Sequence, residues 1–458
     1  MVASVAEHPT PVPAWPVRTM PLPDEITSSW VVRTAHSFGL SGYDLGKTQG
    51  GTNLFWLRDL DTHPDDPTLA KIGARIGVSR QKIRETSLAG LAGTLHETAG
   101  SRKMWVLSRG EWEGSVSFGL QFCSHCLAED ELPYYRRWWR LSLAVSCPRH
   151  GEFLSDRCPS CAAPVRLQRI EPVAAKEPSS SNIARCHRCG FDLRKALPPK
   201  EDRFNPTKLH VYQRFYRTAL RRGHLKLPGF GPIPYSFLYF YTLWHLINKI
   251  YRVKSENAQR LREAIRGELG LSELKLETKA NDFEALCNSD RRILLWMVGW
   301  LVDDWPRRFV RLCRQAGLTS SAFDKIKIEN PYWFAKTVRE YLAVDHSAKR
   351  EVGVKSKSST QRAERFLKTG TMGYLAFLPR IEFVRNHPEL WANPYDLGLA
   401  LINSGLYASK RISKKTLTRR GATFANLART TTNDNEAWTS FSAKPRKPPS
   451  ETKSPAAV

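Results

Sequence analysis

Four pairs of potential metal ligands follow one another between residues 123 and 189. They are Cys123 with Cys126, Cys147 with His150, Cys158 with Cys161, and Cys186 with Cys189. The two-residue spacer lets both side chains of a pair bind one ion across a tight turn, and tetrahedral Zn²⁺ takes four such ligands in structural sites. Eight ligands therefore predict two zinc ions. Only two of the chain's nine cysteines, Cys287 and Cys313, lie outside this window.

The spacing between the pairs favours ligation in sequence order. The first and second pairs would hold one ion and the third and fourth the other, although a cross-braced arrangement of alternate pairs remains open. His125 and His187 lie inside Cys-x-x-Cys turns, where a central side chain points away from the metal, so we do not expect them to be ligands. Because protein atoms fill every position, both sites are expected to be structural and not catalytic.

The composition favours a polyanionic partner. Seventy Lys and Arg against 44 Asp and Glu give a net charge of +26 and a pI near 9.9, which suits nucleic acid better than an acidic small substrate. Metal-bound cysteines predict a reducing compartment, with the cytoplasm as the default. The longest apolar stretches, 233–246 and 293–302, are too short to span a bilayer, so no membrane is expected.

The elements before the cysteines read as helical. Apolar spacing predicts a helix from Asp24 to about Phe38. Residues 42–48 resemble a phosphate-binding loop, but the spacer between the glycines is one residue short and no strand precedes it, so a glycine-rich turn is expected instead. Residues 68–88 have the pattern of a helix-turn-helix, with Ile83 facing the core. This unit would expose four DNA-contact candidates: Arg80, Gln81, Lys82 and Arg84.

Aromatic and basic residues follow. Residues 134–140, Tyr-Tyr-Arg-Arg-Trp-Trp-Arg, are expected to form a helix whose aromatic rings pack the zinc modules, with Arg136 and Arg137 as further DNA candidates. Period-3.6 patterns predict helices over 212–220, 237–253, 256–269, 291–304 and 309–316, and a weak second helix-turn-helix over 311–323. A helical pair over 395–420 would contact phosphates in a salt-dependent way through Lys410, Arg411, Lys414, Lys415, Arg419 and Arg420.

The length of 458 residues predicts several domains in a mainly α protein. The expected order is a disordered leader (1–20), an N-terminal helix-turn-helix domain (21–117), a double zinc-ribbon or zinc-finger module (118–198), a helical domain (199–346), a basic linker (347–370), a basic C-terminal helical region (371–430) and a disordered tail (431–458).

The succession of motifs resembles the TniQ family. It includes Leu22-Pro-Asp-Glu-Ile-Thr-Ser-Ser-Trp30 with Arg33, Phe122-Cys-Ser-His-Cys-Leu-Ala-Glu-Asp130, Pro133-Tyr-Tyr-Arg-Arg-Trp-Trp-Arg140, Cys147-Pro-Arg-His-Gly151 and Arg157-Cys-Pro-Ser-Cys161. The chain departs from the family at Gln121, where arginine is usual, and at Ala162, where glycine usually follows the Cys-x-x-Cys. Neither departure removes a ligand.

The resemblance implies a non-enzymatic target-selection adaptor for DNA transposition. Such a protein links target DNA, or a target-bound CRISPR effector complex, to an AAA+ ATPase of the TniB or TnsC type and so indirectly to a transposase. It also implies that the helix around Trp30 and Arg33 contacts the ATPase or a partner. The alternative is a DNA-binding transcriptional regulator that uses the same helix-turn-helix and zinc modules. An enzyme is disfavoured because the zinc sites are closed and no catalytic constellation is evident.

Overall fold

The computed structural model describes residues 14–50, 54–96, 104–108, 118–172, 182–233, 235–252, 256–271, 273–278, 280–320, 322–323 and 331–342. This part of the chain is mainly helical, as predicted. The basic linker, the C-terminal helical pair with Lys410, Arg411, Lys414, Lys415, Arg419 and Arg420, and the tail lie outside the described residues. No helix among those described is long and apolar enough to cross a bilayer.

The N-terminal part is a cluster of short helices. These are α1 (Thr27–Ser37), α2 (Gly42–Thr48), α3 (Leu54–Leu57), α4 (Pro67–Ile76) and α5 (Arg80–Thr86), followed by the 3₁₀ turn η1 (Leu88–Leu91). The expectation of a glycine-rich turn at residues 42–48 was wrong, because this stretch is helix α2. Its start is fixed by Ser41, whose hydroxyl accepts a hydrogen bond from the Asp44 N–H.

Helices α4 and α5 form the helical pair that the pattern predicted. The Asp66 carboxylate accepts the Thr68 and Leu69 N–H groups at the start of α4, and Ser79 caps α5. Gly77 ends α4 with a left-handed φ of 85°. The helices approach closely at Gly73, where an added Cβ would lie 2.5 Å from Ile83 Cδ1. Ile83 is buried against the core as expected.

The cysteine-rich segment contains little regular structure. Its elements are the short helix α6 (Ser124–Glu129) and the 3₁₀ turns η2 (Arg137–Arg140), η3 (Leu167–Arg169), η4 (Asn182–Ala184) and η5 (Leu193–Lys195). Among the described residues of this segment, strand pairing is limited to isolated bridges such as Phe122 with Ser155. The helix expected over 134–140 is therefore only the turn η2, because Arg136 lies in an extended bridge with Glu25.

Longer helices make up the remainder. They are α7 (Thr207–Arg222), α8 (Ser236–Tyr251), α9 (Glu256–Glu268), α10 (Asn288–Asp303), α11 (Arg307–Gln315) and α12 (Tyr332–Leu342), with a 3₁₀ turn η6 (Phe283–Ala285) before α10. A hairpin of β1 (Leu225–Leu227) and β2 (Gly231–Ile233) joins α7 to α8, with Leu225 opposite Ile233. The weak helix-turn-helix over 311–323 is not tested, because part of it lies outside the described residues.

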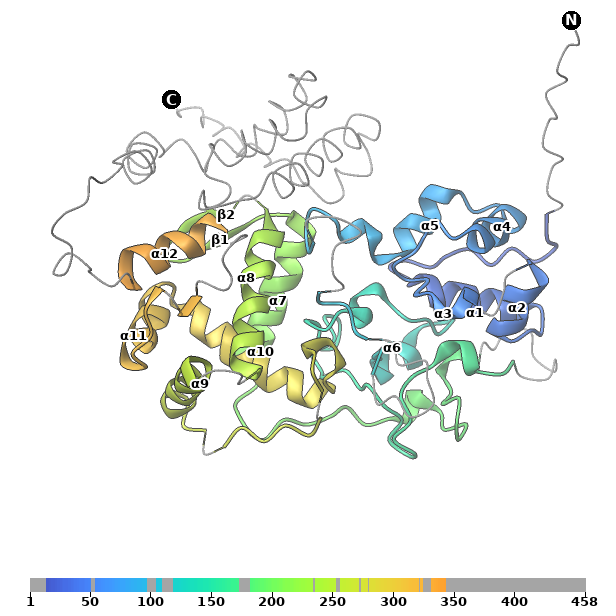
Figure 1. Ribbon diagram of the computed structural model, residues 1–458. Helices are drawn as coiled ribbons and strands as arrows, with labels where there is room; N and C mark the ends of the chain where they lie inside the picture. Colours follow the sequence, from blue (N-terminus) through green and yellow to red (C-terminus); the bar gives the residue numbers. More distant parts are fainter. Residues whose placement is uncertain are drawn as a thin grey trace, which may run out of the picture.

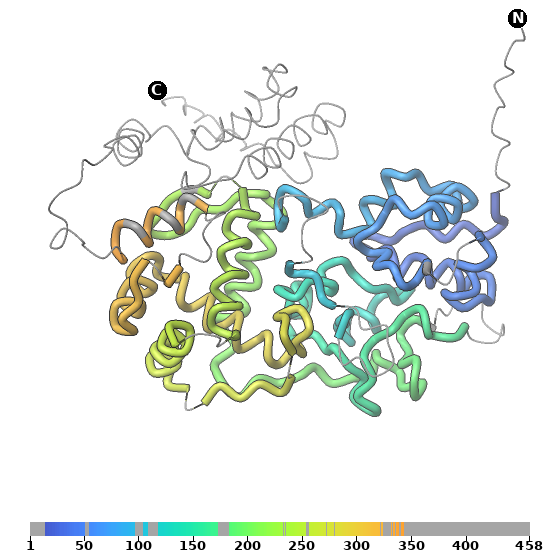
Figure 2. The backbone as a smooth tube through the Cα atoms, viewed as in Figure 1, coloured from blue at the N-terminus to red at the C-terminus, as the bar shows by residue number. Residues whose placement is uncertain are grey.

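The elements are arranged along one elongated body. Figure 1 shows α1 to α5 at one end, α7 to α12 at the other and α6 between them. The backbone trace in Figure 2 follows the same order, with the cysteine-rich segment filling the middle. Buried apolar side chains form one continuous cluster from Ile26 to Leu342, so the middle segment packs against both ends.

Candidate metal centres

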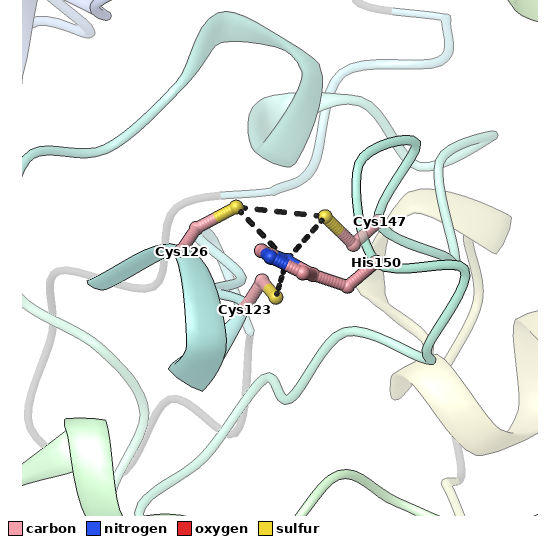
Figure 3. Close-up of side chains that lie close together, drawn as sticks. All are labelled: Cys123, Cys126, Cys147 and His150. Carbon is pink, nitrogen blue, oxygen red and sulfur yellow. Dashed lines mark hydrogen bonds between the residues drawn. The ribbon is translucent and has the colours of Figure 1, made fainter. Parts of the chain in front are cut away.

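The first two ligand pairs meet beside helix α6. Figure 3 shows Cys123, Cys126, Cys147 and His150 converging on one point. The Sγ atoms of Cys126 and Cys147 are 3.6 Å apart, and His150 Nδ1 lies 3.3 Å from Cys123 Sγ and 3.4 Å from Cys126 Sγ. A Zn–S bond of about 2.3 Å gives a tetrahedral S–S edge of about 3.8 Å. The four atoms therefore fit a tetrahedral ion.

A carboxylate orients the histidine of this centre. Nε2 of His150 is 3.1 Å from Glu129 Oε2, which leaves Nδ1 to face the cysteines. Metal-bound histidines commonly donate their second ring N–H to such a group. His125 pairs with Glu152 and is half exposed, although its ring also lies near Cys123. That it is not a ligand stays a prediction.

The third and fourth pairs form the second centre. Sγ of Cys158 is 3.7 Å from that of Cys189, and Sγ of Cys161 is 3.6 Å from that of Cys186. These distances are far too long for disulfides, whose S–S bond is about 2.05 Å, and they match a zinc tetrahedron. Desolvation raises the pKa of Cys158 and Cys186 and so favours their neutral thiol forms. A bound cation would be needed to hold all four cysteines here as thiolates at neutral pH.

Three of the four pairs share one turn geometry. The residue after the second ligand has a left-handed backbone in each, with φ of 71° at Gly151, 57° at Ala162 and 70° at Gly190. Its N–H donates to the carbonyl oxygen of the first ligand at 2.8 to 2.9 Å, for example from Gly151 to Cys147. This turn brings the ends of each motif together and directs both ligands to one side.

The structure thus brings the eight ligands together in sequence order and not in the cross-braced arrangement. Both quartets have the donor set and spacing that zinc takes in structural sites. Each could hold one ion, and the identity of that ion remains a prediction.

A buried arginine joins the segment between the first two ligand pairs to the N-terminal part of the chain. Arg140 is 1 % exposed and donates to Asp61 at 2.9 Å and to Asp59 at 2.6 Å. Its Nη1 also donates to the Leu107 and Gly119 carbonyl oxygens. Asp61 in turn accepts the N–H of Ser28 in α1. Sequence reasoning missed this network, since nothing in the run of residues 134–140 distinguishes Arg140 from the partly exposed Arg136 and Arg137.

A second network joins the same segment to α10. The buried Gln121 side chain donates to the Ala144 carbonyl oxygen at 2.9 Å, and its Oε1 accepts hydrogen bonds from Asn288 and Arg291. An arginine at position 121 could not accept these bonds. The departure from the family pattern noted in the sequence therefore coincides with this contact to α10.

The arginine candidates between the ligand pairs have carboxylate partners. Arg136 donates to both oxygens of Asp130 at 2.8 Å and stacks on the rings of Tyr134 and Trp139. Arg137 donates to Asp24 at 2.9 Å. Contact of these two arginines with DNA stays a prediction, and it would have to compete with these partners. The neighbouring rings of Tyr135, Trp138 and Trp139 are buried, as expected for packing residues.

The candidates on α5 have a more open setting. Arg80, Gln81, Lys82 and Arg84 are all exposed, as the helix-turn-helix pattern predicted. Lys82 lies 3.1 Å from Glu85 and Arg84 2.8 Å from Asp65, but all four of these side chains are about half exposed or more. Such surface pairs contribute at most about 1 kcal/mol. The face is therefore free to exchange these partners for a phosphate.

The helix that the resemblance linked to a partner is buried. Trp30 is fully covered, and Arg33 donates to the buried Glu25 at 2.7 Å. Their visible role is to hold α1 in the core.

Together these features define a basic, mainly helical protein with two candidate metal centres and an exposed helical pair. Residues 16–154 match the model of the TniQ family. The chain therefore carries a TniQ domain, which confirms the resemblance and associates the chain with DNA transposition. The matched segment contains α1 to α5 and the first metal centre, and ends before the second. No curated protein sequence matched the chain.

Proposed function

We infer that this protein is a non-enzymatic target-selection adaptor in DNA transposition, which links target DNA to an AAA+ regulator and through it to a transposase. The observation that carries the proposal is the TniQ domain over residues 16–154. The segment between its first two ligand pairs is tied by Arg140 to Asp59 and Asp61 in the N-terminal part of the domain. A structural metal so placed would stiffen the domain and supply no chemistry, since all four positions belong to the protein.

DNA contact is assigned to the α4–α5 unit. Its exposed Arg80, Lys82 and Arg84 stand on one short helix, and the tight turn at Gly77 fixes that helix relative to α4. The overall charge of +26 would raise the rate and affinity of the encounter with a polyanion. Recruitment through a target-bound CRISPR effector is the other route that the family resemblance allows.

ATPase contact is assigned to the TniQ domain as a whole and not to the side chains of Trp30 and Arg33. Both are buried, so a partner would have to displace core packing to reach them.

Pull-down of the metal-loaded, full-length protein against the AAA+ ATPase encoded in the same element tests the proposal, with and without duplex DNA. We expect capture of the ATPase and salt-dependent binding of DNA. The triple variant R80A/K82A/R84A should weaken DNA binding and leave ATPase capture intact. Loss of three charges elsewhere, in R18A/K275A/R307A, is the matched control.

Three other outcomes decide against parts of the proposal. Absence of both ATPase capture and DNA binding from the metal-loaded protein would refute it. ATPase capture without DNA binding would favour recruitment by a guide complex. Tight binding to its own promoter without ATPase capture would identify a transcriptional regulator.

A further inference from the structure

Helix α7 carries a row of arginines on its exposed side. Arg214, Arg217 and Arg221 are all exposed and follow one another at spacings of three and four residues. At about 100° per residue they lie within one narrow arc of the helix. The opposite side of the helix is buried, with Leu209 and Tyr216 in the core. The three guanidinium groups therefore share one face, called here the α7 arginine face.

These arginines have no acidic partner in the part of the chain that the structure describes. No ion pair or hydrogen bond joins their side chains to another described residue, whereas many other arginines in the described part of the chain are paired, for example Arg84, Arg136, Arg137 and Arg311. Helix α7 itself, TKLHVYQRFYRTALRR, contains no Asp or Glu. A surface helix that serves only solubility usually alternates charges of both signs.

The arrangement is unfavourable for the helix alone. Like charges four residues apart, such as Arg217 and Arg221, each destabilise a helix by about 0.2 to 0.5 kcal/mol. The negative end of the helix dipole stabilises the charges of Arg221 and Arg222 in the last turn. Arg214 and Arg217 lie too far from that end to be stabilised by it. Folding therefore does not account for the α7 arginine face, and a polyanion bound to it would remove the repulsion.

The α7 arginine face is held in a fixed relation to the α4–α5 unit. At the C-terminal end of α7 the Gly223 carbonyl oxygen accepts the Ser236 N–H at 2.7 Å, and the Ser236 hydroxyl donates to the Thr94 carbonyl oxygen at 2.6 Å. Thr94 lies just beyond η1, which directly follows α5. Figure 1 places α5 and the C-terminal end of α7 along the same edge of the molecule.

We propose that the α7 arginine face is a second DNA-binding surface, which contacts the phosphate backbone of the duplex beside the segment met by α5. This inference rests on the proposed function. Arginine suits the role because its planar guanidinium pairs with phosphate oxygens in a bidentate way. Such contacts fix the position and register of a protein on the duplex without reading its sequence. The α7 arginine face would therefore raise affinity for any duplex.

The test compares R214Q/R217Q/R221Q with R18Q/K275Q/R307Q, which removes the same charge from scattered, exposed positions. Binding of the full-length, metal-loaded proteins to a random-sequence duplex is measured by fluorescence anisotropy across a series of salt concentrations. Three lost phosphate contacts should flatten the plot of log K against log salt by about 2.7. Affinity at low salt should fall about tenfold or more, and the control should change much less.

A cross-linking experiment locates the contact directly. Val211 is 50 % exposed and lies on the same side of α7, so a photoreactive benzoylphenylalanine there should cross-link to DNA. The same group at Tyr341, which is 43 % exposed on α12, is the control. Circular dichroism and metal content establish that every variant is folded.

The outcomes separate this inference from the proposed function. Wild-type binding to DNA with an unchanged slope in R214Q/R217Q/R221Q and no cross-link from position 211 would overturn the second surface alone. Failure of the wild type to bind DNA at all would overturn both. Dependence on the α7 arginines for binding to phosphatidylserine vesicles, but not to DNA, would assign the face to a membrane surface and refute the inference.

Discussion

The turn at Ala162 shows how a single residue limits the stability of a metal centre. Its φ of 57° is left-handed, and glycine occupies the equivalent place in the turns ending at Gly151 and Gly190. A residue with a Cβ destabilises the folded state by about 1 to 2 kcal/mol in this conformation. Glycine avoids that cost, but its more flexible unfolded chain offsets up to about 1 kcal/mol of the gain. Because Ala162 is exposed, its replacement removes no core contact.

We therefore expect Ala162→Gly to stabilise the second centre by about 0.5 to 1 kcal/mol. Urea unfolding of the metal-loaded protein and competition with a chelator measure this gain. The control is Ala163→Gly next to it, which is buried and lacks the left-handed backbone; it should be destabilising. A loss of stability in both variants would contradict the argument from the backbone.

Replacing the buried Arg140 should lower the stability of the protein, whereas Ala162→Gly should raise it. Arg140→Ala would leave Asp59 and Asp61 buried without their cation, which typically costs about 3 to 5 kcal/mol. Arg137→Ala removes only a half-exposed pair with Asp24 and should cost less than about 1 kcal/mol. Urea unfolding of the two variants should differ accordingly, and similar losses would mean that Arg140 does not link the segments energetically.

At the scale of elements, the metal ions should determine whether the middle segment folds. The described residues of this segment form one short α-helix and isolated bridges in place of sheets, so backbone hydrogen bonds alone give them little cooperative structure. A structural zinc can contribute on the order of 10 kcal/mol to folding. Loss of a ligand should therefore unfold the module around it.

Cys147→Ala tests this dependence. We expect bound zinc to fall from two ions per chain to one, with loss of tertiary structure in the first centre. Elemental analysis and near-ultraviolet circular dichroism measure the two effects. Cys313→Ala is the control, because that thiol is buried in α11 outside both quartets. Two zinc ions and normal spectra in Cys147→Ala would show that the ligand assignment is wrong.

The elements also show what the sequence allowed us to predict. Helices such as α8 and α10 were recognised because apolar residues recur at the helical period over many residues. The turn expected at residues 42–48 was wrong because two glycines masked a helix that Ser41 caps. The helix expected over 134–140 was wrong because a tertiary bridge to Glu25 holds Arg136 extended.

In the candidate sites, too, the local features could be predicted from the sequence and the long-range contacts could not. The spacing of the cysteines contains the local geometry of each turn, so the ligand pairs could be read directly. The pairing between turns and the contacts of Arg140 and Gln121 join residues far apart in the chain. Local pattern carries no information on such contacts, and only the folded arrangement reveals them.

At the scale of the whole molecule, buried histidines should make stability depend on pH. His96 is 8 % exposed, its Nδ1 has no hydrogen-bond partner among the described residues, and burial lowers its pKa from 6.5 to about 4. Burial also lowers the pKa of His36, His210 and His224. These residues come from both ends of the molecule, so acid acts on the entire core.

The direction in which stability changes with pH follows from the protons that His96 binds in the folded and unfolded states. The unfolded chain takes up a proton at His96 below about pH 6.5, whereas the folded protein does so only near pH 4. The stabilisation is therefore complete above pH 6.5 and is lost as the pH falls from 6.5 towards 4. His96 alone should account for about 2 kcal/mol of unfolding free energy between pH 7 and pH 5.

Urea unfolding of the wild type and of His96→Leu at pH 7 and pH 5 isolates this term. Acid also releases metal from cysteine and histidine ligands, but that effect is common to both proteins and cancels in the comparison. The wild type should lose about 2 kcal/mol more than the variant over this interval. Equal losses in the two proteins would show that His96 already binds its proton in the folded state, and that acid destabilises this molecule through its metal centres instead.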